Sequence, residues 1–210
     1  MISFSILRLI LFAILFTLSF GATQNLSGGM KEGVDAYNRQ DYTVALKEFR
    51  ALAEKGNVKA QNKLGKMYSK GEGVRRDYKE AAKWYRRAIF HGDADAQFAL
   101  AKMYFKGQGV FKNFREAVVY LRKAAGQGHS ESQNILGVMY IKGYGVLRDK
   151  VQAYMWFSLA SISGKNKTAI KNKETIGEKM SPAQIKKALS FAKDWMERIK
   201  KNRGIEKTGR

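Results

Sequence analysis

The residues best suited to chemistry in this sequence are lysines in a regular row. Lys59, Lys63, Lys66 and Lys70 follow one another at intervals of four, three and four residues, which is the spacing of one face of an α-helix. A row of ammonium groups attracts carboxylates, phosphates and other anions. The alternative is a solvated face on a basic protein, and the spacing alone leaves both interpretations open.

Other residue types that support catalysis or metal binding are scarce. Three Gly-x-Gly segments, at 71–73, 107–109 and 143–145, have glycines of the kind found in phosphate-binding loops, but they lack the third glycine and follow predicted helices, so we expect helix ends and turns. His91 and His129 lie at no repeated position and at no ligand spacing, and we interpret both as ordinary loop-edge residues. The absence of cysteine excludes disulfides, thiolate zinc sites and cysteine nucleophiles. We predict no catalytic residue, no cofactor, no metal site and no enzymatic activity.

Charge is the most unusual property of the composition. The chain has 210 residues, with 39 Lys+Arg against 18 Asp+Glu, for a net charge of +21. Residues 57–92 hold ten basic and three acidic side chains, and residues 165–210 hold fourteen and five. Two zones therefore carry most of the excess, which implies an anionic partner or surface. The 45% of apolar residues argues against wholesale disorder.

The N-terminus has the pattern of a targeting segment. Within residues 1–21 the only charge is Arg8, an apolar run extends from Leu9 to Leu18, and Ser19 and Gly21 are small. We interpret residues 1–21 as a signal peptide cut after Gly21 or Ala22; the alternative is an uncleaved anchor, although the run is shorter than a spanning helix requires. The prediction is an exported protein, periplasmic or secreted, with no transmembrane segment after cleavage. Export in turn argues against nucleic acid as the anionic partner.

The middle of the chain repeats with a period of 36 residues. Four glycines keep this step, namely Gly56, Gly92, Gly128 and Gly164. Each period is predicted to hold two helices, and in the first full repeat the first helix covers about residues 60–69 and ends at Gly71. The second helix begins with a capping-box pair, which recurs as Asp77 with Glu80, Asn113 with Glu116 and Asp149 with Gln152. A period of this length indicates an all-α solenoid of stacked antiparallel helix pairs.

The repeat resembles the Sel1-like family, relatives of tetratricopeptide repeats with a longer turn. The resemblance rests on the run Ala-Gln-x-x-Leu-Gly-x-Met-Tyr-x-x-Gly-x-Gly-Val at residues 60–74 and on Asp77, the Ala81–Ala82 pair, Trp84–Tyr85 and Gly92. It implies three repeats, at 57–92, 93–128 and 129–164, after a shorter tetratricopeptide-like hairpin at 22–56. Residues 165–210 are predicted to form a basic C-terminal cap and tail of helices.

The tail has its own helix signals. Ser181, Pro182 and Gln184 have the order of an N-cap, a first helical residue and a capping-box partner. An apolar stripe then follows at helical spacing, formed by Ile185, Ala188, Leu189, Ala192, Trp195, Met196 and Ile199. We expect this helix to cover the exposed end of the stack; the alternative is an amphipathic helix that lies on a membrane.

The resemblance also implies a function. First helices of such repeats line the concave face of the solenoid, which would place six lysines there: Lys59, Lys63, Lys66, Lys70, Lys102 and Lys106. The expected role is an exported scaffold that binds a protein partner rich in acidic residues in this groove. The alternative is a basic module that binds an anionic envelope surface of lipid, lipopolysaccharide or glycan. Some cysteine-rich relatives have been credited with β-lactam hydrolysis, but this chain has none of their cysteines.

Overall fold

The computed structural model describes residues 28–208, and the predicted signal peptide lies outside them. Within that range every regular element is a helix, and no strand is present. The chain divides into two compact units, residues 1–77 and 78–210. The fold is the predicted all-α solenoid class, in which consecutive helices pack as antiparallel pairs.

The first unit contains a helix through residues 28–38, then α2 (Tyr42–Glu54) and α3 (Val58–Lys70). Its fully buried apolar residues include Ala36, Ala45, Phe49 and Leu64. Gly33 permits the first helix to lie directly against Phe49, because a Cβ there would be 2.7 Å from the ring. The helix through 28–38 and α2 therefore form a close hairpin, and α2 packs against α3.

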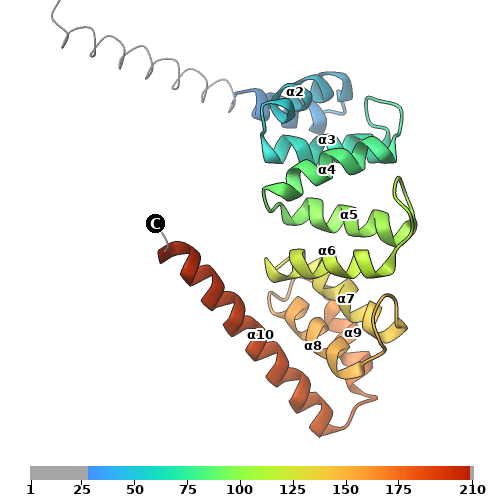
Figure 1. The fold of residues 1–210 in the computed structure, drawn as a ribbon, viewed down its shortest axis with the longest axis vertical. Coiled ribbons are helices and arrows are strands. Elements are labelled where there is room, and N and C mark those ends of the chain that lie inside the picture. The colour runs from blue at the N-terminus through green and yellow to red at the C-terminus, as the bar shows by residue number, and fades with distance from the viewer. Residues whose placement is uncertain (1–27, 209–210) are drawn as a thin grey trace, which may run out of the picture. The chain divides into compact units, whose positions relative to one another are not determined.

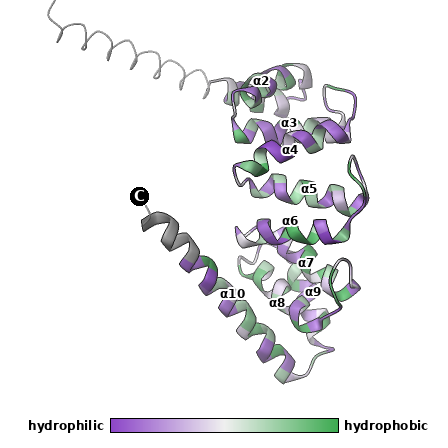
Figure 2. Cartoon of the chain, viewed as in Figure 1, coloured by the Kyte–Doolittle hydropathy of each residue, from purple (hydrophilic) through white to green (hydrophobic). Residues whose placement is uncertain are grey.

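The second unit continues the pattern with seven helices in the part of the chain that the structure describes (Figure 1). They are α4 (Tyr78–Phe90), α5 (Ala94–Lys106), α6 (Phe114–Gly126), α7 (Ser130–Lys142), α8 (Lys150–Ser161), α9 (Lys167–Gly177) and α10 (Pro182–Thr208). Each helix from α4 to α9 packs on its neighbour in sequence, and α10 returns to pack on α8. Figure 2 shows hydrophilic and hydrophobic residues alternating along these helices, as expected where one face of each is buried.

The helix ends follow from the residues at each cap. The side chains of Asn57 and Asp93 accept hydrogen bonds from the backbone N–H groups three residues later, at 3.0 and 2.7 Å. Gly71, Gly107 and Gly143 end α3, α5 and α7 in the left-handed conformation, with φ of 78°, 73° and 75°. The predicted glycine helix ends are confirmed, although α3 extends beyond the expected 60–69 at both ends.

The second glycine of each Gly-x-Gly segment has a role that the sequence did not reveal. Gly109 and Gly145 also have positive φ, 69° and 70°. A Cβ at Gly109 would lie 2.4 Å from the carbonyl oxygen of Tyr78, and one at Gly145 would lie 2.4 Å from that of Phe114. Each turn therefore rests directly on the backbone at the start of the second helix of the preceding pair. The glycines set the distance between consecutive repeats as well as ending a helix.

The C-terminal helix covers the last pair as predicted. The Ser181 N–H donates to Gln184 Oε1 at 2.9 Å, and the Gln184 N–H donates to Ser181 Oγ at 3.3 Å, so the capping box is confirmed. Trp195 packs edge-on against the buried Trp156 with ring centroids 4.8 Å apart. One residue of the predicted stripe was wrong. Leu189 is 49% exposed, and Phe191 instead packs against the core, because the buried Ala188 and Ala192 define a face one step around the helix.

Candidate binding surfaces

Two lysines of the row on α3 lie over an aromatic ring of the first unit. The Nζ atoms of Lys63 and Lys66 lie 5.6 and 5.3 Å from the centroid of the Tyr37 ring, within cation–π range. The Tyr37 hydroxyl donates to Glu72 Oε2 at 2.7 Å, and Lys70 Nζ lies 3.0 Å from Glu72 Oε1. The structure thus brings three predicted lysines to one tyrosine and one carboxylate. We call Tyr37, Lys63, Lys66, Lys70 and Glu72 the lysine cluster.

The electrostatics of the lysine cluster are set by burial and by like charges. Lys63 and Lys66 are half-buried, whereas Lys70 is exposed. Burial lowers the pKa of Lys66, and the neighbouring ammonium groups of Lys70 and Lys63 lower it further, against a smaller opposing effect of Glu72. The charged form of Lys66 is therefore destabilised in the free protein, and an added anion would relieve that cost.

The other three predicted lysines are placed differently. Lys59 is exposed and lines a shallow hollow of the first unit with Met30, Lys31 and Val34. Lys102 and Lys106 belong to the second unit, on α5, where both are exposed. Lys102 Nζ lies 5.4 Å from the centroid of the Phe98 ring, so it repeats the lysine–aromatic contact seen at Tyr37.

A second set of cations, which sequence analysis missed, is held by tyrosines. Guanidinium Nη2 atoms donate to tyrosine hydroxyls in three pairs, Arg50–Tyr68 at 2.8 Å, Arg86–Tyr104 at 3.4 Å and Arg122–Tyr140 at 2.6 Å. The signal was present, because these arginines are themselves 36 residues apart. Each bond links the second helix of one pair to the first helix of the next and fixes the direction of an exposed guanidinium.

His129 was wrongly interpreted as an ordinary loop-edge residue, because it is the N-cap of α7. Its Nδ1 accepts a hydrogen bond from the Ser132 N–H at 3.1 Å, and its Nε2 lies 3.3 Å from Asp95 Oδ1. Because Nδ1 accepts this hydrogen bond, the proton of the neutral ring resides on Nε2, the nitrogen that lies toward the Asp95 carboxylate. The missed signal is the register, since His129 lies 36 residues after Asp93 and 72 after Asn57, which are both N-caps.

The stability of a His129 variant should depend on whether the new side chain can cap the N-terminus of α7. His129→Ala leaves the N–H of the fully buried Ser132 without its acceptor, and we expect a loss of about 1–2 kcal/mol. His129→Asn restores a side-chain acceptor of the kind that Asn57 provides, so its stability should lie within about 0.5 kcal/mol of the native chain. Urea unfolding followed by circular dichroism measures both values, and equal losses in the two variants would contradict the capping role.

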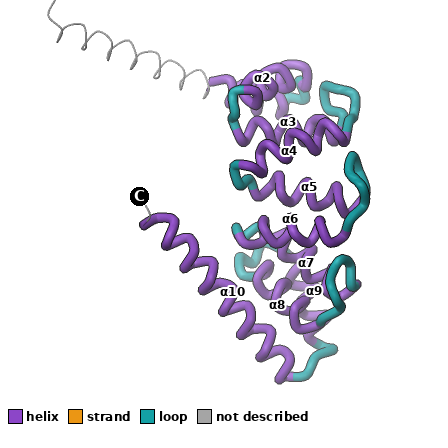
Figure 3. Tube along the Cα trace, viewed as in Figure 1, coloured by secondary structure: helices purple, strands orange, loops and turns teal. Residues whose placement is uncertain are grey.

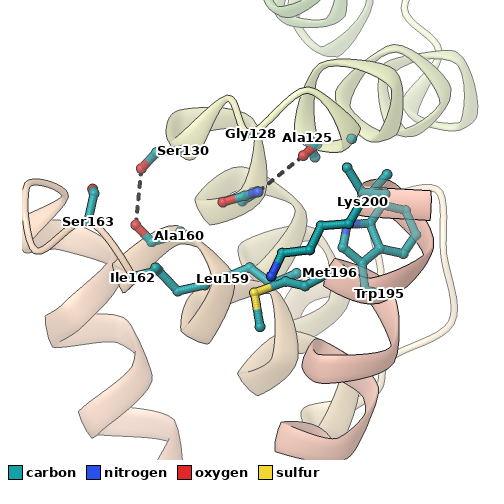
Figure 4. A pocket seen from close by; sticks show the side chains of 13 residues that line it. Ala125, Gly128, Ser130, Leu159, Ala160, Ile162, Ser163, Trp195, Met196 and Lys200 are labelled. Carbon is teal, nitrogen blue, oxygen red and sulfur yellow. Dashed lines mark hydrogen bonds between the residues drawn. The ribbon is translucent and has the colours of Figure 1, made fainter. Parts of the chain in front are cut away.

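A hollow of about 300 Å³ lies where α10 crosses the last repeat. Figure 4 shows Trp195, Met196 and Lys200 of α10 on one side, with Ser130, Ala160 and Ile162 among the residues opposite. Two of its polar side chains form hydrogen bonds within the protein: the Ser130 hydroxyl donates to the Ala160 carbonyl at 3.1 Å, and Gln133 Nε2 donates to the Ala125 carbonyl at 3.1 Å. The lining is mostly apolar and contains no carboxylate and no histidine.

Comparison with known proteins decides the family. The model of the Sel1 repeat matches residues 58–93, 94–129 and 130–165, about half of the chain. This chain belongs to the Sel1 repeat family. A Sel1 repeat protein of Oxalobacter formigenes is 32% identical and has a TM-score of 0.64, with 69% of this chain and 57% of that chain covered. No curated protein matches the chain.

Two further structures extend the comparison of this Sel1 repeat protein. The protective antigen c5321 of uropathogenic Escherichia coli strains is 31% identical with a TM-score of 0.56, and the match covers 73% of this chain and 41% of that chain. The MamA protein, at 18% identity and a TM-score of 0.52, covers 88% of this chain and 97% of that chain and shares the fold alone. The matched region thus spans less than two thirds of both Sel1 relatives.

Sel1 repeats are as a class interaction scaffolds that bind protein partners, and this chain shares their fold. Among the residues that the structure describes, no three His, Asp or Glu side chains converge in a way that would hold a metal ion. Across residues 28–208, the helices are too short or too polar to traverse a bilayer.

Proposed function

We propose that this Sel1 repeat protein is an exported, non-catalytic scaffold that binds an acidic segment of a protein partner. The concave face of the solenoid would supply the contacts, through Lys59, Lys63, Lys66, Lys70, Lys102 and Lys106. The observation that carries the proposal is the lysine cluster, where Lys63 and Lys66 lie over the Tyr37 ring and only Lys70 is paired with the Glu72 carboxylate. The apolar run at residues 9–18 supports the export part of the proposal.

The chemistry of the lysine cluster favours a carboxylate-rich ligand. Half-buried ammonium groups have lost part of their hydration, and Glu72 compensates only one of the three positive charges. A second and third carboxylate from a partner would complete the pairing, with the Tyr37 ring providing an apolar surface beside them. An extended peptide suits a row of cations along α3 because its side chains can reach successive helical turns.

The proposal is tested with a fluorescein-labelled oligoglutamate peptide and the full chain in low salt. The variant carries Lys63→Glu, Lys66→Glu, Lys70→Glu and Lys102→Glu. Its matched control reverses four exposed lysines of the C-terminal region, namely Lys171, Lys179, Lys186 and Lys201. We expect at least a tenfold weaker anisotropy-measured affinity in the variant and less than a twofold change in the control. Equal weakening of both would show that net charge alone attracts the peptide and would overturn the assignment.

Binding should also depend on pH through Lys66. Its pKa is lowered in the free protein by burial and by the neighbouring lysines, and a bound carboxylate would raise it. Affinity should therefore be highest below the free-protein pKa and fall as pH rises through that value. Lys66→Arg keeps its charge across this range, so we expect a flatter affinity profile in the variant. If Lys66→Arg and the native chain had the same dependence of affinity on pH, Lys66 would not contact the ligand.

A further inference from the structure

The loop edge of the second unit displays apolar side chains to solvent. Phe111 is 98% exposed and Leu147 is 90% exposed. They occupy the same position, 36 residues apart, in the loops that join α5 to α6 and α7 to α8. Figure 3 shows these two loops on the same side of the second unit. Single exposed apolar residues are common on protein surfaces, so the informative feature is that two of them lie at matching positions on the same edge.

The exposure of Phe111 and Leu147 follows from the conformation of the loop. The preceding residues, Val110 and Val146, are half-buried, and Val146 packs against the core. The valine fills the inward position of the loop, so the next side chain must point away from the core. In the earlier turn the corresponding residue is Arg75, which shows that the position does not require an apolar side chain for folding.

Aromatic rings support the two tips. The Phe114 ring stacks on Tyr144 with centroids 4.9 Å apart, and Phe105 lies 5.0 Å from Phe114 and 5.7 Å from Tyr144. Because Phe114 follows the first loop and Tyr144 lies in the second, these contacts hold the two loops together. Tyr144 is itself 38% exposed, so the supported surface continues between the tips.

Cations flank the apolar tips. Exposed basic side chains of the two loops and adjoining helix ends are Lys106, Lys112, Arg115, Lys142, Arg148 and Lys150. Only Glu116 and Asp149 are acidic in residues 105–116 and 141–152, and the Asp149 carboxylate accepts hydrogen bonds from the first turn of α8. Lys112 and Arg148 each follow a tip directly in sequence, so each apolar group has a positive charge beside it.

We propose that this loop edge is a peripheral docking surface for an anionic lipid membrane, with Phe111 and Leu147 inserted among the headgroups and the flanking cations on the lipid phosphates. Apolar and aromatic side chains partition into the membrane interface, and basic residues bind anionic lipid surfaces. A protein interface more commonly has few charges at its centre, whereas here the apolar tips stand among cations. The surface is distinct from the lysine cluster and goes beyond the proposed scaffold function.

The test uses the full chain and vesicles of phosphatidylcholine with or without phosphatidylglycerol. The sequence lacks cysteine, so Leu147→Cys accepts a single environment-sensitive NBD label, with Phe90→Cys as the control at an exposed site (86%) on the opposite helix end. We expect a blue shift at position 147 with anionic vesicles only, and none at position 90. The label separates insertion of the tip from vesicle binding through residues 1–21.

Sedimentation with the same vesicles tests the apolar tips and the flanking positive charges separately. Phe111→Ser with Leu147→Ser, and Lys112→Glu with Arg148→Glu, should each reduce at least tenfold the fraction of protein that sediments with anionic but not with neutral vesicles. Phe90→Ser should change this fraction less than twofold. Equal NBD shifts at 90 and 147, or an unshifted label at 147, would overturn the proposal. So would a change of oligomeric state in the serine variant with unaltered lipid binding, which would assign the tips to a second copy of the chain.

Discussion

Gly145→Ala should be among the most damaging single substitutions in the second unit. Gly145 has a φ of 70°, and a Cβ there would lie 2.4 Å from the Phe114 carbonyl oxygen and 2.8 Å from the Arg115 nitrogen. Backbone atoms cannot move aside as a side chain can, so the loop must withdraw from α6. We expect a loss of about 3–5 kcal/mol, the sum of left-handed strain and overpacking, measured by urea unfolding.

Gly128→Ala is the matched control. Gly128 has a φ of 87°, but a Cβ there would meet nothing within 4 Å. Its substitution by alanine therefore isolates the cost of the backbone conformation, about 1–2 kcal/mol. If Gly145→Ala cost no more than Gly128→Ala, the close approach between loop and helix would have no energetic importance, and the second glycine would serve only the turn.

Gly137→Ala should destabilise the chain through a different contact. Gly137 lies within α7, where a Cβ would be 2.4 Å from the ring of the buried Phe157. Alanine favours the helix by about 1 kcal/mol over glycine, yet overpacking costs about 1–3 kcal/mol and such a short contact belongs at or above the upper end. We expect a net loss of about 2 kcal/mol in urea unfolding.

The preceding repeat indicates how that loss can be reversed. At the positions corresponding to Gly137 and Phe157, repeat two has Ala101 and Leu121, both buried in one core cluster. Phe157→Leu should therefore make room for the methyl group, so the double variant should be more stable than the two single losses predict, by about 1–2 kcal/mol. Additive losses would show that the two positions do not compensate each other.

How far the sequence predicted the fold is seen at particular positions. The glycine at 71 and the pair Ser181 and Gln184 act through local hydrogen bonds and backbone angles, which neighbouring residue types determine. The role of Gly145 was missed because it depends on a carbonyl 31 residues away. Leu189 was predicted to face the core in place of Phe191. Several overlapping apolar stripes are possible on one helix, and only the packing partner selects among them.

The lysine row shows a similar division for the candidate surfaces. Its spacing predicted one helical face, but the Tyr37 ring beside Lys63 and Lys66 comes from another helix and could not be inferred from spacing. The Arg–Tyr pairs and the His129 cap were missed although their register was visible. Residues that share a register with known caps or core positions deserve the same interpretation even when their type differs.

The contact between each Gly-x-Gly loop and the preceding pair also makes the loop tip a permissive display position. The glycine and the valine are committed to backbone and core contacts, whereas the next residue is arginine, phenylalanine or leucine in successive turns. Evolution can thus change the chemistry of this edge one residue at a time without disturbing the frame that spaces the tips. The same property would allow an engineer to array chosen side chains at the interval of one repeat.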